Sequence, residues 1–242
     1  MGELRLRVVS WNIHSCVGWR GRYDPDRVAR VLAGLDADVI GLQEVDWRSP
    51  DHEDSDQFSH LAGALGMTPI AGPNLRDHHG HYGNGLLTRL GVEQVRRIEL
   101  AHERREPRGA IDAILTANGA RVQCIVTHLG LKASERGAQL RTIRRVIEED
   151  DPVDARLLLG DMNEWAPHRA PERILTPSPF ARVLSVRSYP SWAPMLRLDR
   201  IFVWPEPSCA SVSAERVGDA RRASDHLPVV ADLVWTIGDE GN

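Results

Sequence analysis

The sequence predicts an α/β fold with two groups of strands of mixed direction. Short apolar runs of strand length alternate with amphipathic stretches and turn clusters along the whole chain. Helices placed outside two face-packed sheets would cover every apolar face of such an arrangement. The 242 residues contain no internal repeat and no low-complexity linker. We therefore expect one domain over residues 1–237 and a frayed tail over residues 238–242.

The chain begins with a predicted strand and helix. Residues 4–11 alternate between apolar and polar types and then become continuously apolar, as a strand that enters a core does. Asp24 and Pro25 mark a helix start, because an aspartate side chain accepts hydrogen bonds from free N–H groups and proline lacks an N–H. Residues 38–42 then predict a strand that is buried on both faces.

A second helix, a loop and a series of strands follow. Residues 56–65 predict a helix that ends at Gly66, and residues 72–85, rich in Gly, His, Asn and Asp, predict a surface loop. The apolar stripe in residues 134–149 predicts a long helix. The remaining strands are expected at residues 85–88, 92–100, 110–117, 121–128, 156–159, 200–203, 208–217 and 229–234.

The composition is ordinary for a globular protein, with 42% apolar and 26% charged residues. A net charge of -4 argues against a protein that grips nucleic acid mainly through its own positive field, but not against an enzyme that brings metal cations to a phosphate. The three widely spaced cysteines form neither a disulfide framework nor a zinc motif. The sequence shows no secretory signal and no membrane-spanning run, so we expect a cytoplasmic enzyme.

Seven short polar clusters, each at the end of an apolar run, carry the chemistry. They are WNIH (11–14), LQEV (42–45), GNGLLTR (83–89), THLGL (127–131), GDMNEW (160–165), LDRIF (198–202) and SDHLP (224–228). Their carboxylates, amides and imidazoles belong to Asn12, Glu44, His128, Asp161, Asn163, Asp199, Asp225 and His226. A hard metal ion and an activated water need such groups. Gathered onto one rim, they would make a phosphoester hydrolase.

Two of these clusters place potential proton-transfer groups at strand ends. Asp161 would accept a proton from water while Asn163 holds that water or a phosphate oxygen, or the two would cap a turn. His226 would act on a phosphoryl oxygen if Asp199 orients its ring. Alternatively, Asp199 would form a surface ion pair with Arg200, worth less than ~1 kcal/mol.

Glu44 follows a buried strand, where a carboxylate that faces other carboxylates needs a cation. Because Mg²⁺ prefers one or two carboxylates plus waters, Glu44 with Asp225 and Asn12 would suit it. The alternatives are an exposed strand-end charge for Glu44 and a hydrogen-bonded core imidazole for His128. Each of these structural interpretations is plausible for a single residue. Because polar groups recur at so many strand ends, a purely structural role for all of them is much less probable.

The ordered motifs WNIH, LQEV, THLGL, GDMNEW, LDRIF and SDHLP resemble those of the endonuclease/exonuclease/phosphatase superfamily, the DNase I-like fold, over nearly the whole chain. The stretches HYGNGLLTR and SYPSWAPMLRLDRIFV resemble a bacterial subgroup of small cytoplasmic members, often encoded near cardiolipin synthases. The resemblance implies a four-layer α/β/β/α sandwich that cleaves phosphoester bonds with Mg²⁺ or Mn²⁺.

By this resemblance, Glu44 is the main metal ligand, with Asn12 and Asp225 nearby. Asp161 orients or deprotonates the attacking water, and Asn163 holds the phosphate or the nucleophile.

The resemblance also assigns the imidazoles. His226, paired with Asp199, stabilises charge on the phosphate or acts as general base, and His128 contacts the opposite phosphate oxygen or acts as general acid. Arg108 and Asn84 are expected to touch the substrate.

Three functions compete on this site. The first is a metal-dependent phosphodiesterase or phosphatase acting on a small or lipid-derived phosphoester. The second is a nonspecific DNA or RNA nuclease, and the third is a non-catalytic binding protein on the same fold. Some nucleases of the superfamily carry an acidic residue where this chain has His14, which favours the first function over a DNA-repair enzyme. No obligate protein partner is evident.

Aromatic residues in predicted loops bear on the choice of substrate. Trp19, Trp47, Trp165 and Trp192 would stack on bases in a nuclease, although we favour their packing under the loops. The segment 190–196 would form an apolar entrance for a lipid, although we favour a buried loop that covers a sheet edge.

Overall fold

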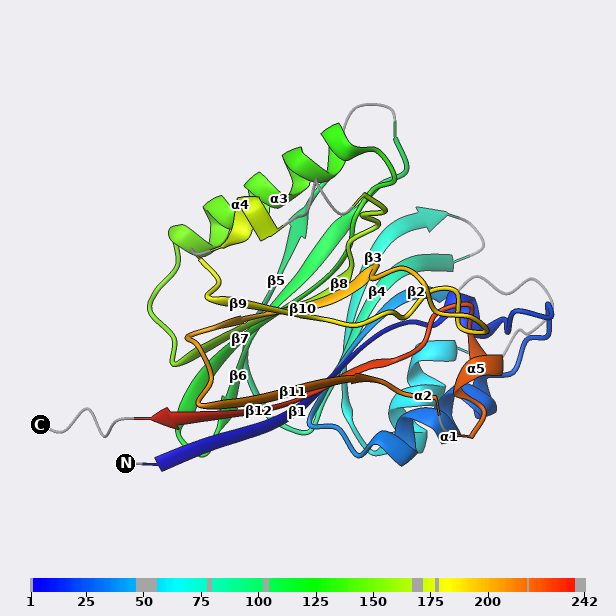
Figure 1. Ribbon diagram of the computed structural model, residues 1–242, viewed down its shortest axis with the longest axis horizontal. Coiled ribbons are helices and arrows are strands. Elements are labelled where there is room, and N and C mark those ends of the chain that lie inside the picture. Colours follow the sequence, from blue (N-terminus) through cyan, green and yellow to red (C-terminus); the bar gives the residue numbers. More distant parts are fainter. Residues whose placement is uncertain are drawn as a thin grey trace, which may run out of the picture.

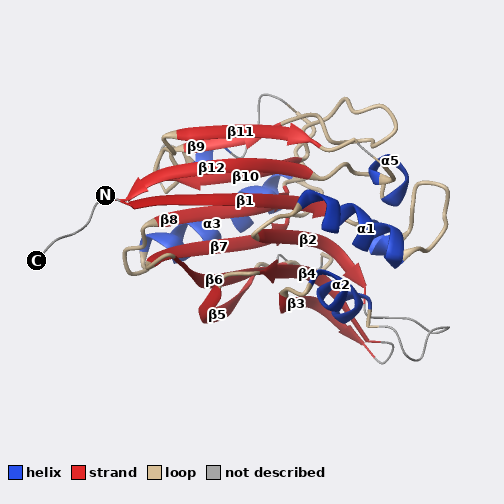
Figure 2. Ribbon diagram, turned by 90° about the horizontal axis from the view of Figure 1, so that it is seen from below, coloured by secondary structure: helices blue, strands red, loops and turns tan. Residues whose placement is uncertain are grey.

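The computed structural model describes residues 2–46, 56–77, 80–101, 105–166, 172–176, 179–216 and 218–237. Two six-stranded sheets pack face to face, and helices cover both outer faces (Figure 1, Figure 2). This is the four-layer α/β/β/α sandwich that the resemblance implies. The tail at residues 238–242 lies outside the described residues.

The first sheet has the strand order β11-β12-β1-β2-β4-β3. Its strands are β1 (Gly2–Asn12), β2 (Val39–Asp46), β3 (Thr68–Asp77), β4 (Gly80–Thr88), β11 (Cys209–Ala214) and β12 (Val229–Ile237). Three α-helices and one 3-10 helix belong to its side of the molecule: η1 (His14–Cys16), α1 (Pro25–Leu35), α2 (Gln57–Leu65) and α5 (Ala220–Ala223).

The second sheet has the order β5-β6-β7-β8-β10-β9. Its strands are β5 (Gly91–Glu99), β6 (Gly109–Ala117), β7 (Ala120–His128), β8 (Ala155–Asp161), β9 (Arg182–Ser185) and β10 (Asp199–Trp204). The helices α3 (Ala133–Glu148) and α4 (Glu172–Leu175) cover its outer face. At 16 residues α3 is the longest helix, and no helix among the described residues meets the length and apolarity that a bilayer crossing requires.

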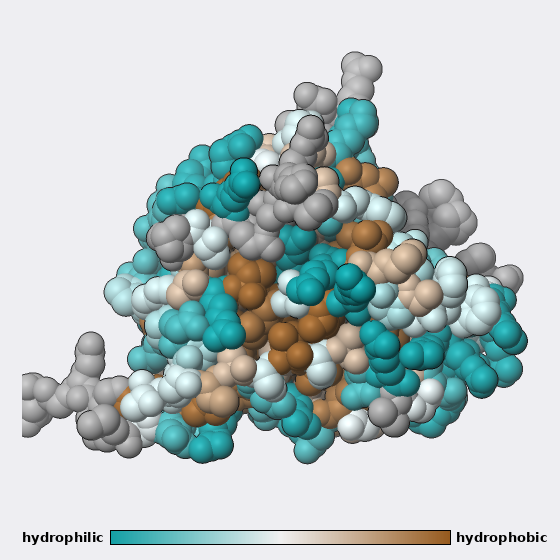
Figure 3. Space-filling view, viewed as in Figure 1, coloured by the Kyte–Doolittle hydropathy of each residue, from teal (hydrophilic) through white to brown (hydrophobic). Residues whose placement is uncertain are grey.

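The apolar residues form three layers, which explains the continuous apolar runs in the sequence. In β1, Leu6 and Val8 face the second sheet, whereas Val9 and Trp11 pack against the helices. A strand covered on both faces must be apolar at successive positions. The inter-sheet core reaches the surface at the β9 and β11 edges, where Figure 3 shows apolar residues gathered in the middle of the face seen in Figure 1.

Strand direction brings the polar clusters to one end of the sandwich. β1 runs parallel to β2, and β7 runs parallel to β8, while β1 and β8 contact each other across the core. The carboxyl ends of these four strands therefore meet at one rim. Antiparallel β10 begins there, with Asp199 opposite Asp161, and antiparallel β12 begins just after His226.

The capping chemistry confirms the two early helices. The Asp24 side chain accepts a hydrogen bond from the Arg27 N–H at 2.9 Å, with Pro25 as the first helical residue of α1. Asp56 caps α2 in the same way, and Gly66 ends that helix with a left-handed φ of 61°.

The surface loop expected over residues 72–85 is wrong. The segment belongs to a hairpin of β3 and β4 that forms one edge of the first sheet. Its glycines serve close packing, because a Cβ on Gly72 would lie 2.3 Å from Ile111 and one on Gly85 would lie 2.4 Å from Phe58. The short elements β9, α4, α5 and η1 were not predicted either.

Candidate active site

A β-bulge in β2 projects Glu44 into the rim. The pairing of β2 with β4 shifts register between Leu42 and Val45, and Glu44 has a left-handed φ of 57°. An extra residue at a bulge re-aims its side chain, and here the Glu44 carboxylate accepts a hydrogen bond from the Asn12 amide at 2.9 Å. Glu44 is therefore neither an exposed strand-end charge nor the last residue of its strand.

The Asn12 amide links two carboxylates from different sheets. Its Nδ2 also donates to Asp161 Oδ2 at 3.3 Å, while its Oδ1 accepts from the backbone N–H of His14 at 3.0 Å. Asp161 and Glu44 therefore lie on either side of one amide group. Asp161 is almost completely buried, at 2% exposure.

The turn after β8 places Asn163 against Asp161. Asn163 has a left-handed φ of 47°, which asparagine adopts more readily than most residues, and its N–H donates to Asp161 Oδ1 at 2.8 Å. Its side-chain Nδ2 contacts His128 Nε2 at 2.9 Å and donates to the Leu129 carbonyl at 2.8 Å. The turn therefore fixes the carboxylate and the amide together.

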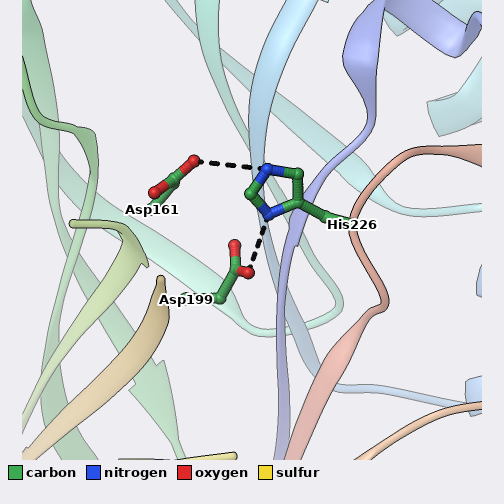
Figure 4. Close-up of side chains that lie close together, drawn as sticks. All are labelled: Asp161, Asp199 and His226. Carbon is green, nitrogen blue, oxygen red and sulfur yellow. Dashed lines mark hydrogen bonds and ion pairs between the residues drawn. The ribbon is translucent and has the colours of Figure 1, made fainter. Parts of the chain in front are cut away.

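His226 lies between two carboxylates, as Figure 4 shows. Its Nδ1 is 2.9 Å from Asp199 Oδ2, and its Nε2 is 3.7 Å from Asp161 Oδ2. Asp199 is fully buried and also accepts a hydrogen bond from the Ser188 hydroxyl at 2.5 Å. Burial alone would lower the pKa of His226, but Asp199, Asp161 and Asp225 outweigh it and raise this pKa to about 10. The ring is an imidazolium at neutral pH.

His128 has the opposite character. Burial lowers its pKa to about 3, and the positive charges of Arg108 and His226 add to that effect against the opposing carboxylate of Asp161. Arg108 Nη1 lies 3.3 Å from His128 Nδ1. Both side chains that approach this ring through nitrogen, Arg108 and Asn163, are N–H donors, which favours the neutral imidazole.

Asp161 is thus flanked by one charged and one neutral imidazole, with His128 Nε2 at 3.6 Å and His226 Nε2 at 3.7 Å. Environments that separate the pKa values of neighbouring groups in this way are typical of acid–base sites.

The other predicted residues lie around this centre in different ways. Asp225 is half-buried, with Oδ1 4.0 Å from His14 Nδ1. Asn84 donates to the Gly109 carbonyl at 2.9 Å, beside Arg108. The Asn84 Oδ1 and Arg108 Nε atoms are buried without a hydrogen-bond partner in the described structure.

Three residues of the site were not identified from the sequence. Tyr82 shares a hydrogen bond with Glu44, and burial together with the Glu44 charge raises the pKa of its hydroxyl. The Tyr189 ring packs on His226 with centroids 4.8 Å apart, and Ser188 holds Asp199. The only available signal was their place inside the two stretches that carry the family resemblance.

The expected packing of tryptophans under the loops is wrong for three of the four. Trp19, Trp165 and Trp192 are 44%, 52% and 60% exposed, and Trp47 lies outside the described residues. The buried loop expected at residues 190–196 is also wrong, since Met195 is 64% exposed. Short loops whose backbone bonds are satisfied locally do not have to bury their side chains.

The donor set fits a hard cation. Asp161, Asp199 and His226 offer ligand atoms within 4.8 Å of one another, an arrangement that could hold a metal ion. Because His226 is protonated and bonded to Asp199, we favour the oxygen-rich side of Asp161. There Glu44 and Asp161 share the Asn12 amide. Carboxylate oxygens of this kind suit Mg²⁺ or Mn²⁺.

A buried ion pair ties helix α3, and the loop that follows His128, to the loop that carries Asn163. Arg136 Nη2 donates to Glu164 at 2.7 Å, and the two side chains are 7% and 4% exposed. Arg136 Nη1 also donates to the Leu131 carbonyl at 2.6 Å. The pair therefore joins the loop after β7 to the loop after β8.

We expect Arg136→Met to lower the free energy of unfolding by about 3 kcal/mol, because it leaves the Glu164 carboxylate buried without its partner. Urea denaturation followed by circular dichroism measures this. The control is Arg144→Met, whose exposed pair with Glu148 should cost less than about 1 kcal/mol. Equal losses in the two variants would contradict a structural role for the buried pair.

The fold and its rim of acid, amide and imidazole groups define a DNase I-like protein. The chain belongs to the endonuclease/exonuclease/phosphatase family, whose sequence profile matches residues 9–226. Members of this family are typically metal-dependent phosphoester hydrolases and include phosphatases and nucleases.

Individual proteins similar to this chain include one relative by sequence and several solved structures. The uncharacterized protein YbhP of Escherichia coli K12 is 27% identical, over 96% of this chain and 97% of YbhP. A family structure from Beutenbergia cavernae is 24% identical, with a TM-score of 0.72 over 95% of this chain and 71% of that one. A mannosyl-6-phosphatase from Bacteroides thetaiotaomicron is 16% identical, with a TM-score of 0.73 over 96% of this chain and 100% of that one. The structural likenesses show the fold.

Proposed function

We propose that the protein is a divalent-metal-dependent phosphoester hydrolase, a phosphodiesterase or phosphatase, that uses an activated water on a small or lipid-derived phosphoester. The supporting observation is the pair of imidazoles at 3.6 and 3.7 Å from the Asp161 carboxylate, one neutral and one charged. A pure binding protein has no use for such a pair around a buried carboxylate.

In this proposal Asp161 accepts the proton of the attacking water. The buried carboxylate keeps its position because the Asn163 N–H and the Asn12 amide both donate to it. Glu44 would hold the Mg²⁺ or Mn²⁺ ion, with Asn12 and Asp225 beside it. The bound ion would supply positive charge that stabilises the phosphoryl oxygens and the displaced oxygen.

The imidazoles divide the remaining work. His226, kept protonated and oriented by Asp199, neutralises charge on a phosphoryl oxygen in the transition state. The neutral His128 and the Asn163 amide hold an opposite phosphoryl oxygen, so that the phosphorus atom faces Asp161. Arg108 and Asn84, which lie beside each other next to Gly109, would contact the substrate.

We expect Glu44→Ala to reduce metal-dependent hydrolysis at least about 10²-fold, because the ion loses its main ligand. Bis-p-nitrophenyl phosphate, p-nitrophenyl phosphate, phospholipid head groups and nucleotides are tested with Mg²⁺, Mn²⁺ and EDTA. Glu206→Ala, an exposed acid paired with Arg182, is the matched control and should leave the rate unchanged. Wild-type protein inactive on the whole panel in every metal would refute the proposal.

A nuclease is the second candidate, and the exposed aromatic side chains favour it. Trp165 contacts Tyr189 edge-on at 5.7 Å, and Tyr189 in turn packs on His226, so an aromatic path leads from the surface to the site. Bases stack on such side chains. Degradation of single-stranded DNA that Trp165→Ala weakens, with bis-p-nitrophenyl phosphate turnover unchanged, would select this function.

A further inference from the structure

A basic pocket lies between the loop after η1 and helix α5. It is lined by Gly18, Trp19, Arg20, Arg22, Arg27 and Arg222 and has a volume of about 270 Å³. Four of its six lining residues are arginines and none is acidic, although the whole chain has a net charge of -4. Guanidinium groups concentrated in this way bind phosphate groups through several parallel N–H bonds.

The positive charge of this pocket is largely unpaired. Arg27 is neutralised by Asp24 at 2.8 Å and lies 3.9 Å from Asp219. Arg20, Arg22 and Arg222 are exposed, and no carboxylate of the described residues lies within ion-pair distance of them. The Arg20 guanidinium lies 4.7 Å from the Trp19 ring centroid, so a cation–π contact with the indole stabilises the position of this charge.

The backbone that carries these arginines is held in place. Val17 and Tyr23 form an isolated antiparallel bridge, and the Gly18 N–H donates to the Arg22 carbonyl at 3.0 Å. A Cβ on Gly18 would lie 2.2 Å from the Arg222 carbonyl oxygen, so this turn packs directly on α5. Two separate segments therefore meet at the pocket in close contact.

Both segments lead directly into the site. The loop continues from Asn12 through His14, whose Nδ1 contacts the Val17 carbonyl at 2.9 Å. Arg222 is followed within four residues by Asp225 and His226. Figure 1 shows α5 beside α1, at the end of the sandwich where β1 and β2 finish.

We infer that this pocket is a second phosphate subsite, which binds a phosphate group of the substrate other than the one under attack. The inference rests on the proposed hydrolase function and narrows its preferred substrates to those with at least two phosphate groups. Arg20, Arg22 and Arg222 supply the N–H donors, because they have no carboxylate partner among the described residues, whereas Asp24 neutralises Arg27.

Calorimetry on the metal-free protein tests the subsite without catalysis. Fructose 1,6-bisphosphate is expected to bind wild type at least tenfold more tightly than fructose 6-phosphate, and increasing salt should weaken its binding. Arg20→Gln with Arg222→Gln should abolish that tenfold advantage. The matched control is Arg141→Gln with Arg145→Gln, two exposed arginines of α3 on the opposite outer layer, and should retain it.

Each other outcome has a defined meaning. Unchanged bisphosphate binding in the Arg20→Gln, Arg222→Gln protein would overturn the subsite. A different result would be that wild type binds both sugars with equal affinity and that the variant binds neither. That result would assign the pocket to a free phosphate ion and overturn the substrate assignment. Turnover of bis-p-nitrophenyl phosphate should be unchanged in the variant. If the wild-type protein shows no turnover, the proposed hydrolase function is refuted. The calorimetry still tests whether the pocket binds a phosphate group.

Discussion

Asp161→Asn is expected to lower kcat for phosphoester hydrolysis at least about 10³-fold while the fold is retained. The amide cannot accept a proton from water, and it removes the negative charge between the two imidazoles. The substitution preserves the size of the side chain and an oxygen that can accept the Asn163 N–H. KM is expected to change much less, because in the proposed mechanism Asp161 acts on the water rather than on the substrate.

Steady-state kinetics with and without Mn²⁺ measures this effect, and thermal unfolding verifies the fold. Asp232→Asn is the matched control, since Asp232 is an exposed acid of β12 paired with Arg7 and should tolerate the change. A rate within threefold of wild type would exclude Asp161 as the proton acceptor.

The layered fold was predictable because the apolar pattern encodes it directly. Strands covered on both faces, such as β1 and β8, read as continuous apolar runs, and the aspartate caps of α1 and α2 are explicit in the sequence. The β3–β4 hairpin was not predictable in this way. Its glycines look like turn residues, and only their close approach to Ile111 and Phe58 in the folded protein explains them.

The residues that gather at the rim were predictable from the sequence, but their geometry was not. Topology alone brings Asn12, His128, Asp161 and Asp199 to one rim. Each of these residues lies at the end of a strand that is paired, in parallel or antiparallel direction, with a strand ending at the same rim. The bulge that aims Glu44 inward leaves no local signature, since its left-handed residue is neither glycine nor asparagine. The opposite charge states of the two imidazoles arise from burial and neighbours, which only the folded chain defines.

Asp199→Asn is expected to lower the pKa of His226 from about 10 and to reduce kcat by about 10²- to 10⁴-fold. In the proposed mechanism Asp199 is a positioning residue, because it bonds to His226 Nδ1 at 2.9 Å and lies behind the ring, whose Nε2 faces Asp161. Without its charge, burial favours the neutral ring. The loss of rate should therefore be smallest at acidic pH, where the variant imidazole is still protonated, and should increase as pH rises.

Nuclear magnetic resonance titration of the metal-free protein reads the pKa of His226 directly. The effect of pH on the free energy of unfolding has a definite sign, because the pKa of His226 is about 10 in the folded protein and about 6.5 in the unfolded chain. The contribution of His226 to the free energy of unfolding is complete at pH values below its unfolded-state pKa. This contribution, a few kcal/mol in total, is lost as pH rises toward 10. Asp199→Asn should flatten this decline, whereas Asp36→Asn, an exposed acid paired with Arg89, should not. A His226 pKa that stays near 10 in Asp199→Asn would show that Asp161 and Asp225 alone hold the proton.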